Sequence, residues 1–227
     1  MNALSRSALA RLVANHLPQS GFVNLGIGAP VQIADYLPDD TEVMLHSENG
    51  ILNVGPRPPE GQEDWDLVNA GKMPVTLAPG GSYFDSATSF TMMRGGHLDL
   101  AILGAFQVSE TGDLANWTAD EGNGSPPGIG GAIDLAVGAR HIWVMMEHVT
   151  RDGTARIVRE CSLPLTARGV VSRIFTNLAV IDVTPRGLVV DALLEGVSLE
   201  HVVAKTAAPL TAGDTVRTFL MDGSVKD

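Results

Sequence analysis

Short apolar runs that alternate with helix-like segments, with glycine and proline turns between them, constrain the fold of this chain most strongly. The helix-like segments repeat apolar residues every three or four positions, whereas the apolar runs are only four to six residues long. We predict helices at residues 5–17, 31–37, 85–93 and 132–137, and strands at 21–25, 42–45, 74–77, 98–103 and 141–146. This alternation is typical of an α/β fold with an open, mainly parallel sheet and helices on both faces.

The C-terminal third has shorter segments. Strands are predicted at residues 174–183 and 188–193, in a hairpin around Pro185–Gly187, and a helix at 199–205 with Ser198 as its cap. We expect a single domain over residues 1–210, followed by a polar C-terminal tail at 211–227. Residues 55–66 are polar and proline-rich, which suggests a lid or a contact arm.

Charge and composition exclude several classes of function. The 15 basic and 26 acidic residues leave a net charge of −11, so nucleic acid and anionic membranes are poor candidate partners. No apolar run is long enough to span a membrane, and residues 1–12 lack the apolar core of a secretion signal. Cys161 is the only cysteine, so an internal disulfide is impossible. We therefore expect a cytoplasmic protein.

The segment Asn24–Pro30 places two glycines, Gly26 and Gly28, between a predicted strand and a predicted helix. Such a turn lets the backbone approach a phosphate group closely. A dinucleotide-binding fingerprint would need a third glycine at position 31, which is Val31 here. Glu48 does lie at the sequence separation at which that fingerprint has its ribose-binding acid. A plain strand–helix turn is the alternative.

Glu48 lies in the segment Ser47–Gly50, at the end of a predicted strand. Ligands of open α/β sheets bind beyond the carboxyl ends of the strands, so this carboxylate is a candidate nucleophile, general base or ribose ligand. The alternative is a solvated carboxylate in a turn.

Three glycine pairs, Gly80–Gly81, Gly95–Gly96 and Gly130–Gly131, each lie after or near a strand end and could supply backbone amides to an oxyanion hole. Gln107, Asn116 and His97 are polar residues between apolar stretches, and each is more often structural than a ligand. Arg94 could bind a substrate carboxylate, with an ordinary salt bridge as the alternative. The spacing of His and acidic residues matches no metal motif, so we expect no metal site.

Several stretches together resemble the family I CoA-transferases, and more narrowly the B (β) subunit of the 3-oxoacid type. They are residues 24–30, 47–52, 93–99, 103–108, 112–117 and 130–135. The resemblance runs from the first predicted helix to about residue 210. The stretches at 121–126, 145–148 and 183–188 resemble members that use 3-oxoadipate, and acetoacetate is the alternative acceptor.

The resemblance implies ping-pong transfer of CoA from succinyl-CoA to a 3-oxoacid, with Glu48 as the catalytic nucleophile. It assigns Asn24, Gly130 and Gly131 to the oxyanion and substrate site. Gly26, Gly28, Gln107 and Asn116 are assigned to CoA binding. It implies no tightly bound cofactor and no metal; the coenzyme A thioester is a substrate. It also implies a separate A subunit as partner, in an (AB)₂ heterotetramer.

Two positions depart from this family pattern. Residues 125–127 are Ser-Pro-Pro where many relatives have a lysine before the glycine stretch, and residue 177 is asparagine where an acidic residue is usual. Two other classes remain open from the residues alone. One is a different enzyme on the same fold, such as an acyl-CoA hydrolase or a sugar-phosphate isomerase. The other is a nucleotide-binding module without catalysis.

Overall fold

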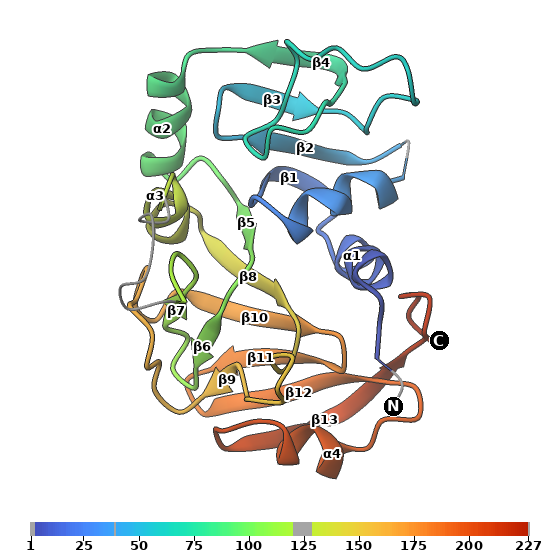
Figure 1. The fold of residues 1–227 in the computed structure, drawn as a ribbon, viewed down its shortest axis with the longest axis vertical. Coiled ribbons are helices and arrows are strands. Elements are labelled where there is room, and N and C mark those ends of the chain that lie inside the picture. The colour runs from blue at the N-terminus through green and yellow to red at the C-terminus, as the bar shows by residue number, and fades with distance from the viewer. Residues whose placement is uncertain (1–2, 39, 120–128, 227) are drawn as a thin grey trace.

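A computed structural model describes residues 3–38, 40–119 and 129–226. Five parallel strands form the middle of its main sheet: β1 (Ser20–Leu25), β2 (Glu42–Ser47), β5 (Leu100–Leu103), β8 (His141–Met146) and β10 (Val171–Thr176). They lie in the order β10-β8-β5-β1-β2 (Figure 1). The predicted α/β fold with a mainly parallel sheet is confirmed.

Further strands extend this sheet on both sides to a total of ten. β3 (Ile51–Val54) and β4 (Leu77–Tyr83) add an antiparallel pair beyond β2. Beyond β10 lie β11 (Ala179–Thr184), β12 (Gly187–Leu194) and β13 (Leu210–Phe219). A separate small sheet has the order β7 (Leu114–Ala115), β6 (Gln107–Ser109), β9 (Ile157–Val158). The large sheet places the carboxyl ends of β1, β2 and β5 next to one another.

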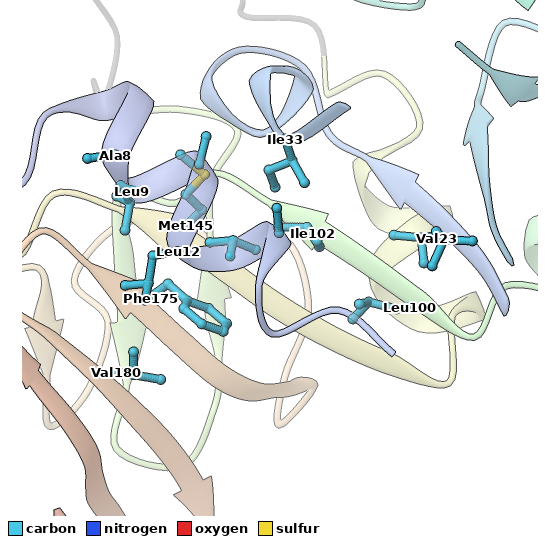
Figure 2. Packing of buried hydrophobic residues seen from close by; sticks show 14 of the residues in the cluster. Ala8, Leu9, Leu12, Val23, Ile33, Leu100, Ile102, Met145, Phe175 and Val180 are labelled. Carbon is cyan, nitrogen blue, oxygen red and sulfur yellow. The ribbon is translucent and has the colours of Figure 1, made fainter. Parts of the chain in front are cut away.

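Helices cover both faces of the sheet, as predicted. α1 (Arg6–Ala14) and the 3₁₀ helix η1 (Ala29–Tyr36) pack together on one face, and α2 (Ser86–Arg94) and α3 (Ala132–Gly138) pack together on the other (Figure 1). Strand β5 joins the two cores, because Leu100 and Ile102 point to the first and Ala101 and Leu103 to the second. Figure 2 shows α1 packed on the sheet through its buried leucines.

Side-chain caps fix where α1, α2 and α4 begin. The Ser5 hydroxyl accepts a hydrogen bond from the Ala8 amide at 3.1 Å, and Asp85 does the same for the Thr88 amide at 2.8 Å. Ser198 caps α4 (Leu199–Ala204), as the sequence predicts. Among the described residues, no helix is long and apolar enough to cross a membrane.

The predicted polar tail is corrected for residues 211–219. Thr211–Phe219 belong to β13, which pairs in parallel with β12 at the edge of the sheet, and Phe219 is fully buried. The polar composition misled because an edge strand has one side open to solvent, so half of the residues of β13 are exposed.

Other boundaries also differ from the predictions. The strand expected at 74–77 begins only at Leu77, and the one expected at 174–183 is two strands that turn at residues 177–178. The helix expected at 31–37 is a 3₁₀ helix that begins at Ala29. Residues 55–66 form the first part of the connection from β3 to β4 and contain no helix or strand.

Candidate active site

Glu48 follows β2 directly, in the tight turn that leads into β3. The Gly50 amide donates to the Ser47 carbonyl at 3.0 Å and closes this turn. Gly50 has φ +114°, and a Cβ there would lie 1.9 Å from the Phe84 carbonyl oxygen, so only glycine fits. The turn therefore holds Glu48 at the carboxyl end of a central strand, where the sequence predicts it.

The carboxylate of Glu48 faces the start of α3. The Gly131 amide donates to Glu48 Oε1 at 3.4 Å, and a Cβ on Gly131 would lie 2.8 Å from Oε2. Gly130 is adjacent, with a Cβ position 3.6 Å from Oε1. The structure therefore brings Glu48, Gly130 and Gly131 together, although 82 residues separate Glu48 from Gly130 in the sequence.

Burial raises the pKa of Glu48 above its ordinary value. The Gly131 amide lowers this pKa, and the nearby negative charge of Asp134 raises it further. Among the described residues, no lysine, arginine or histidine forms a salt bridge with Glu48. A half-buried carboxylate without a cation is basic and poorly solvated, which suits a nucleophile.

Glu48 opens onto a cleft of about 470 Å³. The predicted residues Gly26, Asn116, Gly130 and Gly131 also line this cleft. Further lining residues include Arg6, Trp117, Glu147 and Arg156, to which sequence reasoning gave no role in a site. Trp117 and Glu147 lie in stretches that carry the family resemblance, whereas Arg6 and Arg156 lie in no motif; only the folded chain brings the four to the same place.

Asn24 does not line this cleft. Its side chain is buried, and its Nδ2 donates to the His46 carbonyl at 3.1 Å and to His46 Nδ1 at 3.0 Å. His46 Nε2 lies 3.0 Å from the Ser89 hydroxyl, and burial lowers the pKa of His46 to about 4. The neutral ring therefore donates from Nε2 to Ser89, and this buried network ties β1 and α2 to the strand that carries Glu48.

Gln107 also lies outside the cleft. Its side-chain oxygen accepts from the Ser162 amide at 2.9 Å and from the Leu163 amide at 3.1 Å. These bonds tie β6 to the segment after β9, so the side chain has a structural role in this structure. Asn116 lines the cleft, while its Oδ1 accepts from the Thr166 hydroxyl at 2.6 Å.

Gly28 lines a second cavity of about 440 Å³. This cavity lies beside the first, and Ile27 in the turn after β1 lines both. His46, Arg57 and Asn69 are among its polar residues. The Gly26–Gly28 turn therefore separates two cavities, and Glu48 lines only the first.

Other candidates have structural roles or lie elsewhere. Arg94 pairs with Asp134 at 2.6 Å, so the ordinary salt bridge is the observed outcome. His97 is exposed. The described part of the chain holds no cluster of His, Cys, Asp or Glu that could bind a metal ion.

The stretch at 121–126 and residues 125–127 lie outside the described residues. Asn177 accepts a hydrogen bond from the His148 amide at 2.9 Å.

Comparison with known proteins identifies the family. A family model described as coenzyme A transferase matches residues 6–205. The chain belongs to the coenzyme A transferase family. The resemblance seen in the sequence is confirmed, and with it the expectation of an enzyme that transfers coenzyme A.

Two curated relatives match this CoA-transferase over most of their length. The B subunit of 3-oxoadipate CoA-transferase from Pseudomonas putida is 53% identical over 207 residues, which cover 91% of this chain and 96% of the relative. The B subunit of succinyl-CoA:3-ketoacid coenzyme A transferase from Helicobacter pylori is 46% identical over 89% of this chain and 97% of the relative.

A solved structure shows the same fold in a longer protein. It is the acyl-CoA transferase YdiF of Escherichia coli O157:H7, in a thioester complex with CoA, with a TM-score of 0.71 and 19% identity. The match covers 98% of this CoA-transferase chain but only 44% of that protein.

Proposed function

We propose that this chain is the catalytic B subunit of a 3-oxoadipate CoA-transferase. It moves CoA from succinyl-CoA to 3-oxoadipate by a ping-pong mechanism through a glutamyl-CoA thioester. The single observation that carries the proposal is the carboxylate of Glu48, half-buried in the cleft, with the Gly131 amide at 3.4 Å and no salt bridge among the described residues. The similarity to the 3-oxoadipate enzyme at 53% identity supports this acceptor over other 3-oxoacids.

In the first half-reaction, the Glu48 carboxylate attacks the thioester carbonyl of succinyl-CoA. The carbon–sulfur bond breaks, which gives a mixed anhydride of Glu48 and succinate together with the CoA thiolate. The thiolate attacks the side-chain carbonyl of Glu48, and succinate leaves with the anhydride oxygen. Glu48 then carries CoA as a thioester, and no proton has been transferred.

The second half-reaction runs the same steps in reverse. A carboxylate of 3-oxoadipate attacks the glutamyl thioester and displaces the CoA thiolate, which gives a second anhydride. The thiolate attacks the acyl carbonyl of this anhydride. The products are 3-oxoadipyl-CoA and the free Glu48 carboxylate.

Each attack creates a tetrahedral oxyanion, and each preorganised hydrogen-bond donor stabilises the transition state by about 3–4 kcal/mol. The amides of Gly130 and Gly131 are the proposed donors, because they lie beside the Glu48 carboxyl group. Asn24 would donate only if its Nδ2 left His46. We therefore propose that Asn24 holds the strand in place.

CoA binds as a substrate in this proposal, and the chain carries no tightly bound cofactor or metal. Gly26 and Asn116 contact CoA in the cleft, and Gly28 lets the adjacent turn approach it. Gln107 contributes indirectly by ordering β6. The complete enzyme contains a separate A subunit, is an (AB)₂ heterotetramer and works in the cytoplasm. Both curated relatives are named as B subunits, which supports a partner A chain.

An acceptor panel on the complex with the A subunit tests this function. We expect succinyl-CoA to transfer CoA to 3-oxoadipate with a higher kcat/KM than to acetoacetate. A preference for acetoacetate would instead support the second acceptor, which the 46% identity to the 3-ketoacid enzyme favours. Loss of the thioester without any acceptor, at the rate seen with acceptor, would contradict CoA transfer and indicate a hydrolase.

A further inference from the structure

Arg156 is fixed in the cleft by its backbone and lies just before β9. Its amide donates to the His148 carbonyl at 3.2 Å, and its own carbonyl accepts from the Val108 amide at 2.9 Å. Both bonds tie it to residues that are fully buried. The side chain is half-buried and lines the same cleft as Glu48. The fold therefore fixes the backbone of Arg156 at the cleft, and the Ala105 carbonyl accepts a hydrogen bond from its guanidinium group.

The guanidinium group of Arg156 has no counter-ion within the described ranges. No carboxylate there lies within 4.0 Å of it, although Glu147 lines the same cleft. Nη1 donates to the Ala105 carbonyl at 3.3 Å, and the buried Nε has no hydrogen-bond partner among the described residues. A partly desolvated cation with an unused donor is unfavourable unless an anion joins it.

Arg173 is a half-buried arginine outside the cleft, and it is paired with carboxylates. Its side chain is 23% exposed, and it binds Asp182 through two hydrogen bonds of 2.6 and 3.1 Å. Asp191 lies 3.9 Å away as a second partner. Arg156 is half-buried too, but no carboxylate in the described part of the chain pairs with it. A bound ligand can therefore supply the anion that complements it.

The proposed substrates supply such an anion. Succinate and 3-oxoadipate each have two carboxylates, of which one reacts at Glu48 and the other must be accommodated in the cleft. A guanidinium group fits a carboxylate with two parallel hydrogen bonds. Arg6 also lines the cleft, but it lies in the first turn of α1 and is exposed to solvent.

We propose that Arg156 binds the carboxylate of the acyl substrate that does not react, and thereby selects dicarboxylic acids over monocarboxylic acids of the same length. This inference rests on the proposed function for the identity of the substrates. It adds a specificity-determining residue that lies 108 residues from Glu48 in the chain.

The kinetic test uses the complex with the A subunit and the variants Arg156→Met and Arg156→Lys. In a ping-pong reaction, kcat/KM for the acceptor reports only the second half-reaction, so the donor does not affect it. We expect Arg156→Met to lower kcat/KM for 3-oxoadipate about 10- to 100-fold, mainly through KM, and to change the value for acetoacetate by less than about threefold. Arg156→Lys should recover part of the loss, because it restores the charge without the planar fork.

The matched control is Arg159→Met, which removes an exposed arginine three residues further on. It should leave both acceptors unchanged. An equal loss with both acceptors in Arg156→Met would show a structural role and overturn the proposal, and no loss with either would do so too.

A binding measurement separates this proposal from the proposed function. Calorimetry on the same complex compares adipate with hexanoate, two acids of equal chain length. We expect the wild type to bind adipate at least about tenfold more tightly, and Arg156→Met to lose this preference. If the wild type fails to use 3-oxoadipate but prefers adipate through Arg156, only the proposed acceptor is wrong. If the wild type shows no preference for adipate, the role of Arg156 is wrong.

Discussion

Charged side chains on the C-terminal strands and those in the cleft differ in whether they form salt bridges. On β10–β13, Arg173 pairs with Asp182 and Asp191, and Asp191 also pairs with Arg217. In the cleft, Glu48 and Arg156 face the same space and have no salt bridge among the described residues. Paired charges stabilise a surface modestly, whereas unpaired charges in a cleft are available for a ligand.

Neighbouring carboxylates at the start of α3 show the same contrast at short range. Asp134 lies in the first turn of α3 and pairs with Arg94, while Glu48 accepts a hydrogen bond from the Gly131 amide. The two carboxylates are close enough for the charge of Asp134 to raise the pKa of Glu48. The fold therefore pairs Asp134 with a cation and leaves Glu48 without one among the described residues.

Replacing the proposed nucleophile, Glu48, should have the largest effect. Glu48→Gln keeps the size of the side chain but removes the nucleophile, so kcat should fall at least about a thousandfold. Steady-state kinetics of the complex with the A subunit measures this. Glu42→Gln, at the exposed start of the same strand, is the control and should be fully active. Normal turnover in Glu48→Gln would contradict the nucleophile role.

Crowding the same carboxylate should have the next largest effect. Gly131 has φ −84° and ψ 8°, which alanine tolerates, so Gly131→Ala should fold normally. Its Cβ would lie 2.8 Å from Glu48 Oε2 and displace the carboxylate. We expect kcat to fall about a hundredfold, with an unchanged melting temperature. Full activity would show that Glu48 does not react in the position seen here.

The parallel core and Glu48 could be predicted from the sequence because both have local signals. Near-continuous apolar runs report strands buried on both faces, and Glu48 follows one of the predicted strands directly. The strands β6, β7 and β9 are only two or three residues long, too short for any periodicity. They form only because the small sheet packs against the rest of the fold.

The wall of the cleft is less predictable. Arg156 lies in a polar stretch with no motif, and its lack of a counter-ion in the described part of the chain is visible only in three dimensions. The family resemblance assigns Asn24 as a donor, and the sequence cannot show that His46 already accepts from its amide. Residue type predicts the available chemistry, and tertiary contacts decide which groups remain free.

The carboxylate of Glu48 should also affect stability, in the direction opposite to activity. The pKa of Glu48 is raised in the folded chain, so the folded state binds its proton more tightly than the unfolded state. The ionised carboxylate therefore destabilises the fold above this raised pKa, and the effect vanishes below the ordinary pKa. Glu48→Gln should melt at a higher temperature than the wild type at pH 7 and at the same temperature near pH 3. A lower melting temperature at pH 7 would contradict this.

Breaking a paired charge should have the smallest effect. Asp191→Asn removes the partner of Arg217 and the second partner of Arg173, and the Asp191 side chain is 20% exposed. We expect the free energy of unfolding to fall by about 1 kcal/mol or less, with unchanged kcat. Urea denaturation and steady-state kinetics measure the two quantities. A loss of activity comparable to that of Glu48→Gln would remove the contrast between the two regions.

Trapping the covalent intermediate is the most direct test of whether Glu48 carries CoA. The complex with the A subunit is incubated with succinyl-CoA, treated with borohydride to reduce a glutamyl thioester, and digested for mass spectrometry. We expect Glu48 to be converted to the corresponding alcohol, and neither Glu147 nor Asp134 to be modified. Modification of another carboxylate, or none in a complex that turns over, would contradict the assignment of Glu48 as the residue that carries CoA.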